Sequence, residues 1–270
     1  MVSPIPLDYR ENEVARGKNR VIEQLKPRLD VHNSEMPVLC QACEARHRGI
    51  CGVLTPSQLV TLSKHTTKQV VSPEQQIAFE GETTKRFANI LHGVVKLSKL
   101  TADGRQQIVG LQFAPDFMGR PFSKENDYAV EAATEVRLCS FPRSTLEQLT
   151  TESPELEHRL HQQTLKELGE AREWMLTLGR KSASERVASF LHFIAMHINP
   201  EVSHTHGSQQ FEIPLKRSDI ADFLGLTIET VSRQFTRMRQ AGVIKISNNR
   251  TIEIPDMAKL AALTETNIQD

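Results

Sequence analysis

Four cysteines are the residues of this chain whose type and spacing point most directly to chemistry. Cys40 and Cys43 form a Cys-x2-Cys pair, Cys51 follows after seven intervening residues, and Cys139 is the only other cysteine. Together they supply the full ligand set of a thiolate-bound metal centre. Structural zinc usually takes its thiolates as two close pairs, whereas this chain offers one pair and two single cysteines. The spacing therefore favours an iron–sulfur cluster modestly over zinc.

Two other interpretations of the cysteines remain open at this level. A zinc site with three cysteines and His47 in place of Cys139 has suitable ligand types, although it would be cramped. Redox-active thiols without any metal are the other alternative. Arg46 and Arg48 lie in the same loop. Their charges would offset the net negative charge of an iron–sulfur cluster with thiolate ligands.

The composition limits the class of protein. The 270 residues include 33 Lys and Arg against 33 Asp and Glu, and 39% are hydrophobic. This supports cores for two domains and gives no global charge that would attract nucleic acid or a membrane. The first residues lack the apolar run of a signal peptide, and no stretch approaches the roughly 20 apolar residues of a membrane span. We expect a cytoplasmic protein with no membrane partner, whose cysteines bind metal or do redox chemistry rather than form disulfides.

The C-terminal end carries the pattern of a winged helix-turn-helix. A short helix with Ser218 as its N-cap and a second helix capped by Thr227 are separated by Gly225, where the motif needs a left-handed residue. Two alternating segments, residues 243–246 and 251–254, surround an Asn-Asn turn and predict a β-wing. We therefore expect a DNA-binding domain at this end of the chain.

The second helix of this motif presents one polar face suited to base reading. Arg233 can hold guanine with two hydrogen bonds, and Glu229 can accept one from cytosine. The alternative is a solvated charged face on a helical hairpin that binds no DNA. However, residues 205–250 contain seven Lys and Arg against four Asp and Glu, a local excess that suits phosphate contacts. We expect double-stranded DNA as a partner, with further contacts from Lys216, Arg217, Thr236, Arg237 and Lys245.

Between these two ends the sequence predicts an α+β protein. Short β-runs between residues 67 and 150, broken by turns such as Asp103-Gly104, predict a small antiparallel β-roll. The expected organisation is a flexible N-terminal arm (1–35), a cysteine segment with a β-roll sensor domain (36–153), a dimerisation helix (154–182), and a winged helix-turn-helix domain (183–270) in which residues 199–210 form a linker.

A long helix is predicted to begin at Ser153-Pro154. Apolar and small residues then recur at intervals of three and four, as in the seam of a coiled coil. Such a helix either packs on its own domain or pairs with a second copy of the chain. The sustained period on a charged helix favours a homodimer. The predicted seam contains Leu168, Ala171, Met175 and Leu178.

Three motifs together resemble the cyclic-AMP receptor / fumarate–nitrate reduction regulator superfamily, and best its oxygen-sensing branch of rhizobial and related type. They are the cysteine pattern, the sequence LGRKSASERVASFL at residues 178–191, and the sequence LGLTIETVSR at residues 224–233. The last one contains the family's Glu-x-x-Ser-Arg reading motif. The resemblance covers nearly everything from residue 40 onward.

This resemblance implies that the four cysteines bind an oxygen-labile 4Fe–4S cluster. It also implies that Glu229, Ser232 and Arg233 read a TTGAT half-site. In that family the cluster-loaded protein is a homodimer under low oxygen. The resemblance thus implies binding to a TTGAT-N4-ATCAA-like palindrome and regulation of anaerobic or microaerobic genes as an activator, with RNA polymerase as a further partner.

The branch of the superfamily that binds cyclic nucleotides differs from this chain. Its phosphate cassette needs Gly-Glu-Leu and then an Arg followed by Ala or Ser. Here the matching stretch has Arg120 directly after Gly119, and no phosphate-binding Arg stands in the expected place. We therefore expect no cyclic-nucleotide site.

The function expected from the sequence is that of an oxygen-responsive transcriptional regulator, not of an enzyme. A zinc-stabilised or thiol-redox DNA-binding regulator that does not sense oxygen is one alternative. An iron–sulfur redox enzyme with an accessory domain is the other. It is disfavoured because no Gly-rich phosphate loop follows a strand anywhere in the sequence.

Overall fold

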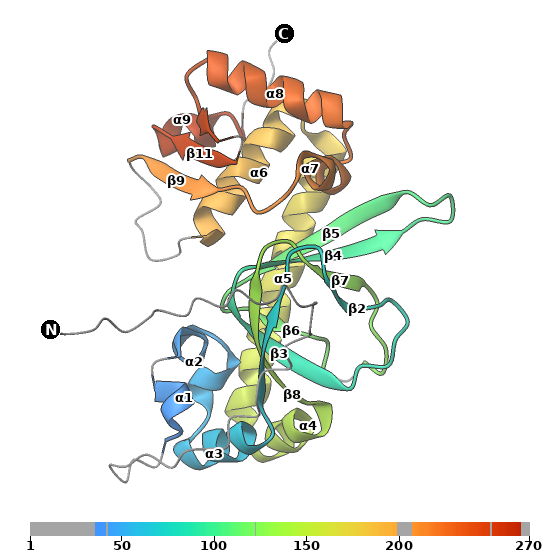
Figure 1. Cartoon of the computed structure of the whole chain (residues 1–270), viewed down its shortest axis with the longest axis vertical. Coiled ribbons are helices and arrows are strands. Elements are labelled where there is room, and N and C mark those ends of the chain that lie inside the picture. The colour runs from blue at the N-terminus through green and yellow to red at the C-terminus, as the bar shows by residue number, and fades with distance from the viewer. Residues whose placement is uncertain (1–35, 42, 122, 199–206, 249, 266–270) are drawn as a thin grey trace, which may run out of the picture.

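A computed structural model describes most of the chain from residue 36 onward. The described residues are 36–41, 43–121, 123–198, 207–248 and 250–265. The predicted N-terminal arm lies outside them. Figure 1 shows the cysteine segment and the β-roll toward one end, the C-terminal domain at the other end, and the long helix α5 running between them. In the described part of the chain, no helix is both long and apolar enough to cross a membrane.

The β-roll consists of two four-stranded antiparallel sheets, with strand orders β1-β8-β3-β6 and β2-β7-β4-β5. Apolar side chains of both sheets, such as Ile90, Val95 and Leu138, are fully buried in a common core. This confirms the predicted β-roll. The strands are β1 (Thr67–Val71), β2 (Gln76–Ala78), β3 (Arg86–His92), β4 (Val94–Leu100), β5 (Gln106–Phe113), β6 (Phe117–Met118), β7 (Ala129–Ala132) and β8 (Val136–Pro142).

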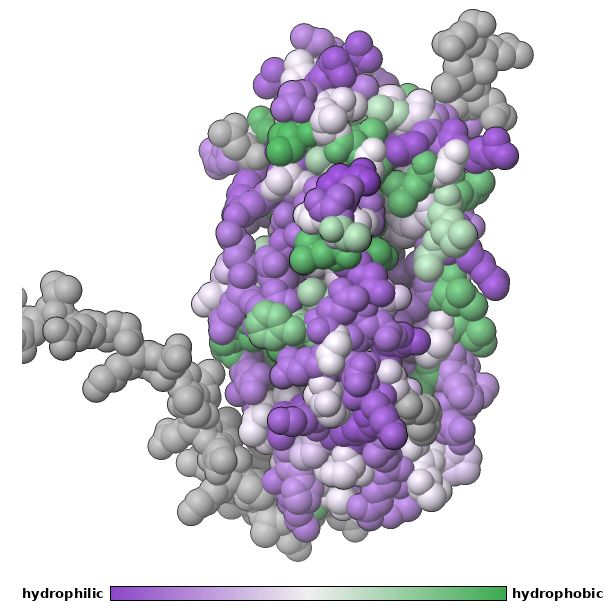
Figure 2. All heavy atoms as spheres, turned by 90° about the vertical axis from the view of Figure 1, so that its right-hand side faces the viewer, coloured by the Kyte–Doolittle hydropathy of each residue, from purple (hydrophilic) through white to green (hydrophobic). Residues whose placement is uncertain are grey.

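The turn between β4 and β5 forms as the Asp103-Gly104 signal predicts. Gly104 has a φ of +83°, which a glycine adopts without steric cost. The resulting hairpin projects from the body of the roll (Figure 1). Hydrophilic side chains cover much of the face toward which it projects, and hydrophobic side chains gather there in separate patches (Figure 2).

Helix α5 (Pro154–Arg180) begins where the sequence predicts. The Ser153 hydroxyl accepts a hydrogen bond from the backbone N–H of Leu156 at 3.3 Å, and Pro154 occupies the first turn. Leu156 and Leu160 bury this end of the helix in the domain core. The other helices of the N-terminal part are α1 (Val38–Gln41), α2 (Glu44–Arg48), the 3-10 helix η1 (Ile50–Val53), α3 (Pro56–Lys64) and α4 (Arg143–Glu152).

The exposed face of α5 overlaps the predicted dimer seam without coinciding with it. Leu168 and Met175 are 43% and 73% exposed, and Ala171 is exposed as well. Leu178 is instead half-buried. Two large apolar side chains outside the predicted seam are 67% and 53% exposed, namely Leu165 and Leu176.

The C-terminal domain is a winged helix-turn-helix, as predicted. Helices α7 (Arg217–Leu224) and α8 (Ile228–Gln240) are separated by Gly225, whose φ is +61°. The Thr227 hydroxyl caps α8 by accepting a hydrogen bond from the backbone N–H of Thr230 at 3.2 Å. The remaining elements are α6 (Ala183–Ile198), β9 (Gln209–Glu212), β10 (Lys245–Ser247), β11 (Thr251–Ile254) and α9 (Met257–Ala262).

Two details of this domain correct the sequence-based expectation. Gln209 and Gln210, assigned to the linker, belong to β9, which pairs with β11 in a three-stranded sheet. Gln209 is buried and Gln210 is exposed, as the alternation of a strand requires. The N-cap of α7 is Lys216, and Ser218 lies inside the helix, so the predicted Ser218 cap is wrong.

The roll and the C-terminal domain touch through β4, β5 and α7. Lys96 on β4 is 5% exposed, and its Nζ lies 3.1 Å from a carboxylate oxygen of Asp219 on α7. The same Nζ lies 2.9 Å from Glu131 on β7. Gln107 on β5 donates a hydrogen bond from Nε2 to the carbonyl oxygen of Phe223 at 3.3 Å. A buried cation thus links the two domains.

Candidate metal centre and nucleic-acid interface

The four predicted metal ligands converge on one place in the fold. Cys40 lies in α1, Cys43 lies between α1 and α2, Cys51 lies in η1, and Cys139 lies in β8. Cys40 and Cys43 are close enough to both Cys51 and Cys139 to raise the pKa of those two thiols electrostatically, and Cys139 has the same effect on Cys51. Segments that are far apart in the sequence therefore bring all four predicted ligands together.

Strand pairing explains how Cys139 reaches the other thiols. Strand β8 lies between β1 and β3, and the cross-strand neighbours of Cys139 are Lys68 on β1 and Asn89 on β3. Directly opposed residues in antiparallel strands share one face of the sheet. On that face Asn89 donates a hydrogen bond from Nδ2 to Sγ of Cys51 at 3.3 Å. The sheet therefore presents a cation, a thiol and an amide in one row toward the cysteine segment.

Burial makes these thiols hard to ionise in the metal-free protein. It raises the pKa of Cys51 to about 12, and the charges of Cys139 and Cys40 add to this effect while the hydrogen bond from Asn89 opposes it. Burial likewise raises the pKa of Cys139 to about 12, with a further contribution from Cys43. At neutral pH both groups are therefore neutral thiols, and metal binding must displace their protons.

Two cationic side chains lie near the thiols. Burial and the neighbouring Cys43 raise the pKa of Cys40, and Lys68 and Arg46 offset part of this increase. Lys68 acts on Cys139 in the same way. A bound cation removes the mutual repulsion of the thiolates far more effectively than distant Lys or Arg side chains do. The donor set thus fits a cationic centre that takes thiolate ligands, as zinc and iron–sulfur cores both do.

The thiols do not form a closed site for one ion. Among the residues that the structure describes, no group of three or more His, Cys, Asp or Glu side chains is arranged to hold a single metal ion. In a tetrahedral zinc site the sulfurs lie about 3.8 Å apart, because each is about 2.3 Å from the metal. His47, the alternative fourth ligand, is exposed. The four thiols of the described chain therefore lie near one another without being arranged around a single ion.

The cysteine segment packs on the start of α5. Ile50 and Cys51 are buried in one core cluster with Leu156 and Leu160. The guanidinium of Arg159 on α5 also donates a hydrogen bond to the carbonyl oxygen of Arg48. The C-terminal half of the cysteine segment therefore buries apolar surface against the helix. Its contacts connect the thiols directly to the helix predicted to form the dimer.

The predicted DNA-reading residues share the exposed face of α8, at the end of the molecule away from the cysteine segment (Figure 1). The opposite face of α8 is buried through Val231, Phe235 and Met238. The hydrogen bonds that Glu229 accepts from its own backbone N–H and from the Thr227 hydroxyl lower the pKa of its carboxyl group. The carboxylate is therefore ionised and able to accept a hydrogen bond. The exposed residues on this face are Glu229, Ser232, Arg233, Thr236 and Arg237.

The residues predicted to contact DNA phosphates are partly engaged elsewhere. Lys216 Nζ lies 2.6 Å from Glu74 of the roll. Lys245 Nζ lies 2.6 Å from Glu253 within the wing. The Arg217 guanidinium lies 3.4 Å from the centroid of the Phe235 ring, and burial lowers the pKa of Arg217 to about 10. Arg217 thus contributes to packing inside the domain, which the sequence did not indicate.

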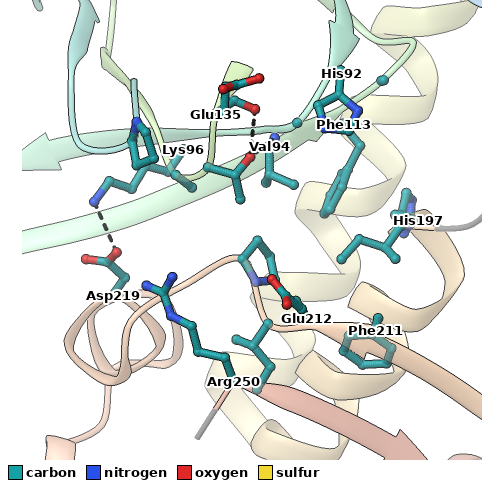
Figure 3. Close-up of a pocket in the computed structure, with 18 of the residues that line it drawn as sticks. His92, Val94, Lys96, Phe113, Glu135, His197, Phe211, Glu212, Asp219 and Arg250 are labelled. Atoms are coloured by element: carbon teal, nitrogen blue, oxygen red, sulfur yellow. Dashed lines mark hydrogen bonds and ion pairs between the residues drawn. The ribbon is translucent and has the colours of Figure 1, made fainter. Parts of the chain in front are cut away.

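A cavity of about 870 Å³ lies between the roll and the C-terminal domain. Figure 3 shows Lys96, Phe113 and His92 on the side of the roll, with Arg250 and Asp219 on the opposite side. The cavity is separate from the thiols, because no cysteine lines it.

The stretch compared with the cyclic-nucleotide cassette is occupied by protein contacts. Arg120 forms an ion pair with Asp127. A side chain at Gly119 would collide with the Phe87 ring, since a Cβ there would lie 2.2 Å from it. The arginine of this stretch therefore already has a carboxylate partner.

A β-roll joined by a long helix to an exposed reading helix defines a transcription regulator of the helix-turn-helix class. Residues 185–263 match the family model of the Crp-like helix-turn-helix domain, and residues 68–153 match that of the cyclic nucleotide-binding domain.

Comparison with individual known proteins narrows the family to which the chain belongs. It is 52% identical over 237 residues to a "Probable transcriptional activator" of Rhizobium leguminosarum bv. viciae, covering 86% of this chain and 98% of that protein. It is 36% identical over 230 residues to the transcriptional activator protein FnrL of Cereibacter sphaeroides, covering 84% of this chain and 93% of that protein. The chain is similar to the structure of FixK2 from Bradyrhizobium japonicum, with a TM-score of 0.67 at 30% identity, covering 75% of this chain and 99% of that one. The chain belongs to the Crp/Fnr family and is a transcriptional activator of the Fnr/FixK type, which confirms the predicted superfamily, fold class and non-enzymatic role.

Asn89 and Lys68 are the site residues that the sequence analysis missed. Asn89 interrupts an apolar strand sequence, RFANILH, and a single amide in such a run is a usable signal of a special contact. Lys68 carries no comparable signal, because its place beside Cys139 depends on the pairing of β1 with β8.

Proposed function

We propose that this activator responds to oxygen through a 4Fe–4S cluster bound by Cys40, Cys43, Cys51 and Cys139. The observation that carries the proposal is the convergence of these four thiols beside the start of α5. A bound cluster supplies an oxygen-labile redox centre whose stability depends on solvent access. The nearby cations Lys68 and Arg46 suit its net negative charge.

The chain's own residues would transmit the state of this site to α5. A metal centre bound by all four thiols would link the cysteine segment to Cys139 of the roll. This link would hold Ile50 and Cys51 against Leu156 and Leu160, where the core of the domain meets the first turns of α5. Without it, the segment is retained by the packing of η1, by the bond from Asn89 to Cys51 and by the bond between Arg159 and Arg48. The equilibrium then shifts toward a detached segment and a less fixed helix.

We propose that α5 pairs with its copy in a homodimer. Support comes from the exposed apolar side chains Leu165, Leu168, Met175 and Leu176, because burying large apolar side chains on one helix is what a coiled-coil contact achieves. A two-fold dimer would place two α8 helices about 34 Å apart on successive turns of DNA.

The DNA site follows from the exposed face of α8. Arg233 would bond a guanine and Glu229 a cytosine of a TTGAT half-site, with Ser232 beside them, in a TTGAT-N4-ATCAA-like palindrome. We further propose that the protein acts in the cytoplasm with RNA polymerase as a partner. No cyclic nucleotide is required, a proposal supported by the pairing of Arg120 with Asp127.

The composition of anaerobically purified protein tests the proposed cofactor. We expect about four iron and four sulfide per chain and a broad visible absorption that bleaches in air. Cys→Ser at Cys40, Cys43, Cys51 or Cys139 should abolish this absorption, whereas the matched Ser98→Ala, a buried polar position of β4, should retain it. Stoichiometric zinc without visible absorption would replace the proposal with a zinc-stabilised regulator. Full cluster retention in Cys139→Ser would exclude Cys139 as a ligand.

A further inference from the structure

Asn89 is a polar side chain in a position that the fold alone does not explain. It lies in the middle of β3, is 1% exposed, and has the buried neighbours Ala88 and Ile90 on either side in the strand. A buried amide is tolerated only where its polar atoms are paired. Within the described part of the chain, its Oδ1 has no hydrogen-bond partner. An apolar side chain at this position would leave no buried polar atom unpaired. The packing of β3 therefore does not explain the amide, and the explanation lies in the contact that its Nδ2 makes.

That other contact is the thiol of Cys51. The Asn89 Nδ2 donates to Cys51 Sγ at 3.3 Å, and both side chains are buried. The cross-strand pairing also places Asn89 beside Cys139, so the amide lies next to two of the four thiols. A hydrogen bond to a sulfur ligand stabilises the more negatively charged state of the centre that the sulfur binds.

We propose that Asn89 is a positioning residue of the metal centre, which orients the Cys51 sulfur and withdraws negative charge from it through the Nδ2–H···Sγ bond. This inference rests on the proposed cluster function, since it concerns the same thiols. Its consequence is that Asn89 raises the reduction potential of the bound centre. Loss of the donor should lower that potential and make metal retention weaker.

Two substitutions that keep the number of side-chain heavy atoms separate this role from simple packing. Asn89→Leu removes the N–H donor together with the unpaired Oδ1, so the metal-free fold should lose no stability. Asn89→Asp keeps the shape but places a carboxylate beside the Cys51 sulfur. The negative charge disfavours the Cys51 thiolate, so metal binding should weaken more than in Asn89→Leu. The matched control is Gln112→Leu. Gln112 is another buried amide with an unpaired oxygen, and its Nε2 bonds to Phe117 and Glu167 rather than to a cysteine.

The experiment measures three properties of the anaerobic full-length protein and its variants. They are iron and sulfide content, the reduction potential by dye-mediated titration followed spectroscopically, and the thermal unfolding midpoint of the metal-free form. We expect Asn89→Leu to show a more negative potential than wild type with an unchanged or higher unfolding midpoint. Asn89→Asp should retain several-fold less iron, and Gln112→Leu should keep the wild-type potential.

The outcomes distinguish the two proposals. A loaded wild type with the same potential and iron content in Asn89→Leu and Asn89→Asp would overturn the role of Asn89 and leave the cluster in place. A wild type that holds no cluster would overturn both. Complete loss of the cluster in Asn89→Leu, with a normal unfolding midpoint and a loaded Gln112→Leu, would support the proposed role.

Discussion

The thiols at one end of this molecule come from two separate parts of the chain, the cysteine segment and β8, whereas the side chains proposed to read DNA come from a single helix at the other end. The thiols are half-buried or buried, and burial raises the pKa of three of them. The reading residues on α8 are exposed. A site assembled across the fold depends on tertiary contacts and can be weakened by losing one of them. A site on one amphipathic helix keeps its geometry as long as the helix is packed.

We expect damage to the reading helix α8 to change DNA recognition without affecting the thiols, and Arg233→Ala should show the largest effect. We expect a loss of roughly 1–3 kcal/mol per half-site and a relaxed preference at one base pair, because two hydrogen bonds to guanine are removed. The measurement is a binding series on palindromes substituted at each base. Arg239→Ala removes the same charge from the last turn of α8 and serves as the matched control.

Lys245→Ala sharpens this distinction, since Lys245 lies in the wing and not on α8. It should weaken binding to all sequences alike. It should also reduce the magnitude of the salt slope, which is the slope of log binding constant against log salt concentration, by about 1. If Arg233→Ala also lowered affinity equally for every substituted palindrome, Arg233 would be a phosphate contact, and the assignment of the reading face would be wrong.

The next effect concerns α5, which connects the two regions. Leu165→Ala should weaken a homodimer by roughly 1.5–3 kcal/mol for each large side chain that loses its burial in the interface. Ala171→Leu, at a seam position predicted from the sequence, should strengthen it by roughly 1–2 kcal/mol. Sedimentation of the metal-free protein over a range of concentrations measures both. An unchanged dimer in Leu165→Ala together with a stronger one in Ala171→Leu would show that the interface follows the seam predicted from the sequence instead of the most exposed stripe.

The smallest effect is expected where the roll touches the DNA-binding domain. Lys216 pairs with Glu74, and this contact lowers the pKa of Glu74. Glu74→Gln should free Lys216 for DNA phosphate and make binding slightly stronger, with a salt slope steeper by up to about 1. The same gain should appear in wild type as the pH falls through the lowered pKa of Glu74, because protonation also ends the pairing. Glu80→Gln is a control on the roll, since Glu80 pairs with Lys99. Equal slopes for the Glu74 variant and wild type would show that Lys216 does not contact phosphate.

The sequence predicted the DNA-binding half of the molecule closely because its signals are local. Gly225 in the left-handed region and the Thr227 cap fix the two helices within a few residues, and the exposed face of α8 follows from helical periodicity. The errors there, at Ser218 and in β9, concern the ends of elements, where several residues can satisfy the same cap or strand pattern.

The sequence could predict which cysteines are ligands, but not which other side chains surround them in the fold. The spacing of the thiols carries no information about which strands pair, so Lys68 and Asn89 could not be placed next to Cys139. The burial of Ile50 against α5 was missed for the same reason, since it depends on how the segment docks on the helix. Such contacts are tertiary and appear only once the topology is known.

The proposed coupling of the thiols to DNA binding is tested by the DNA affinity of one anaerobic sample, measured on a TTGAT-N4-ATCAA palindrome before and after exposure to air. We expect the affinity to fall as the visible absorption bleaches. A coupling of this kind is typically worth about 5- to 150-fold. Cys139→Ser should already show the low affinity without air, whereas Ser98→Ala should behave as wild type. Undiminished affinity in a sample that has lost its cluster would contradict the link between the thiols and the reading helix.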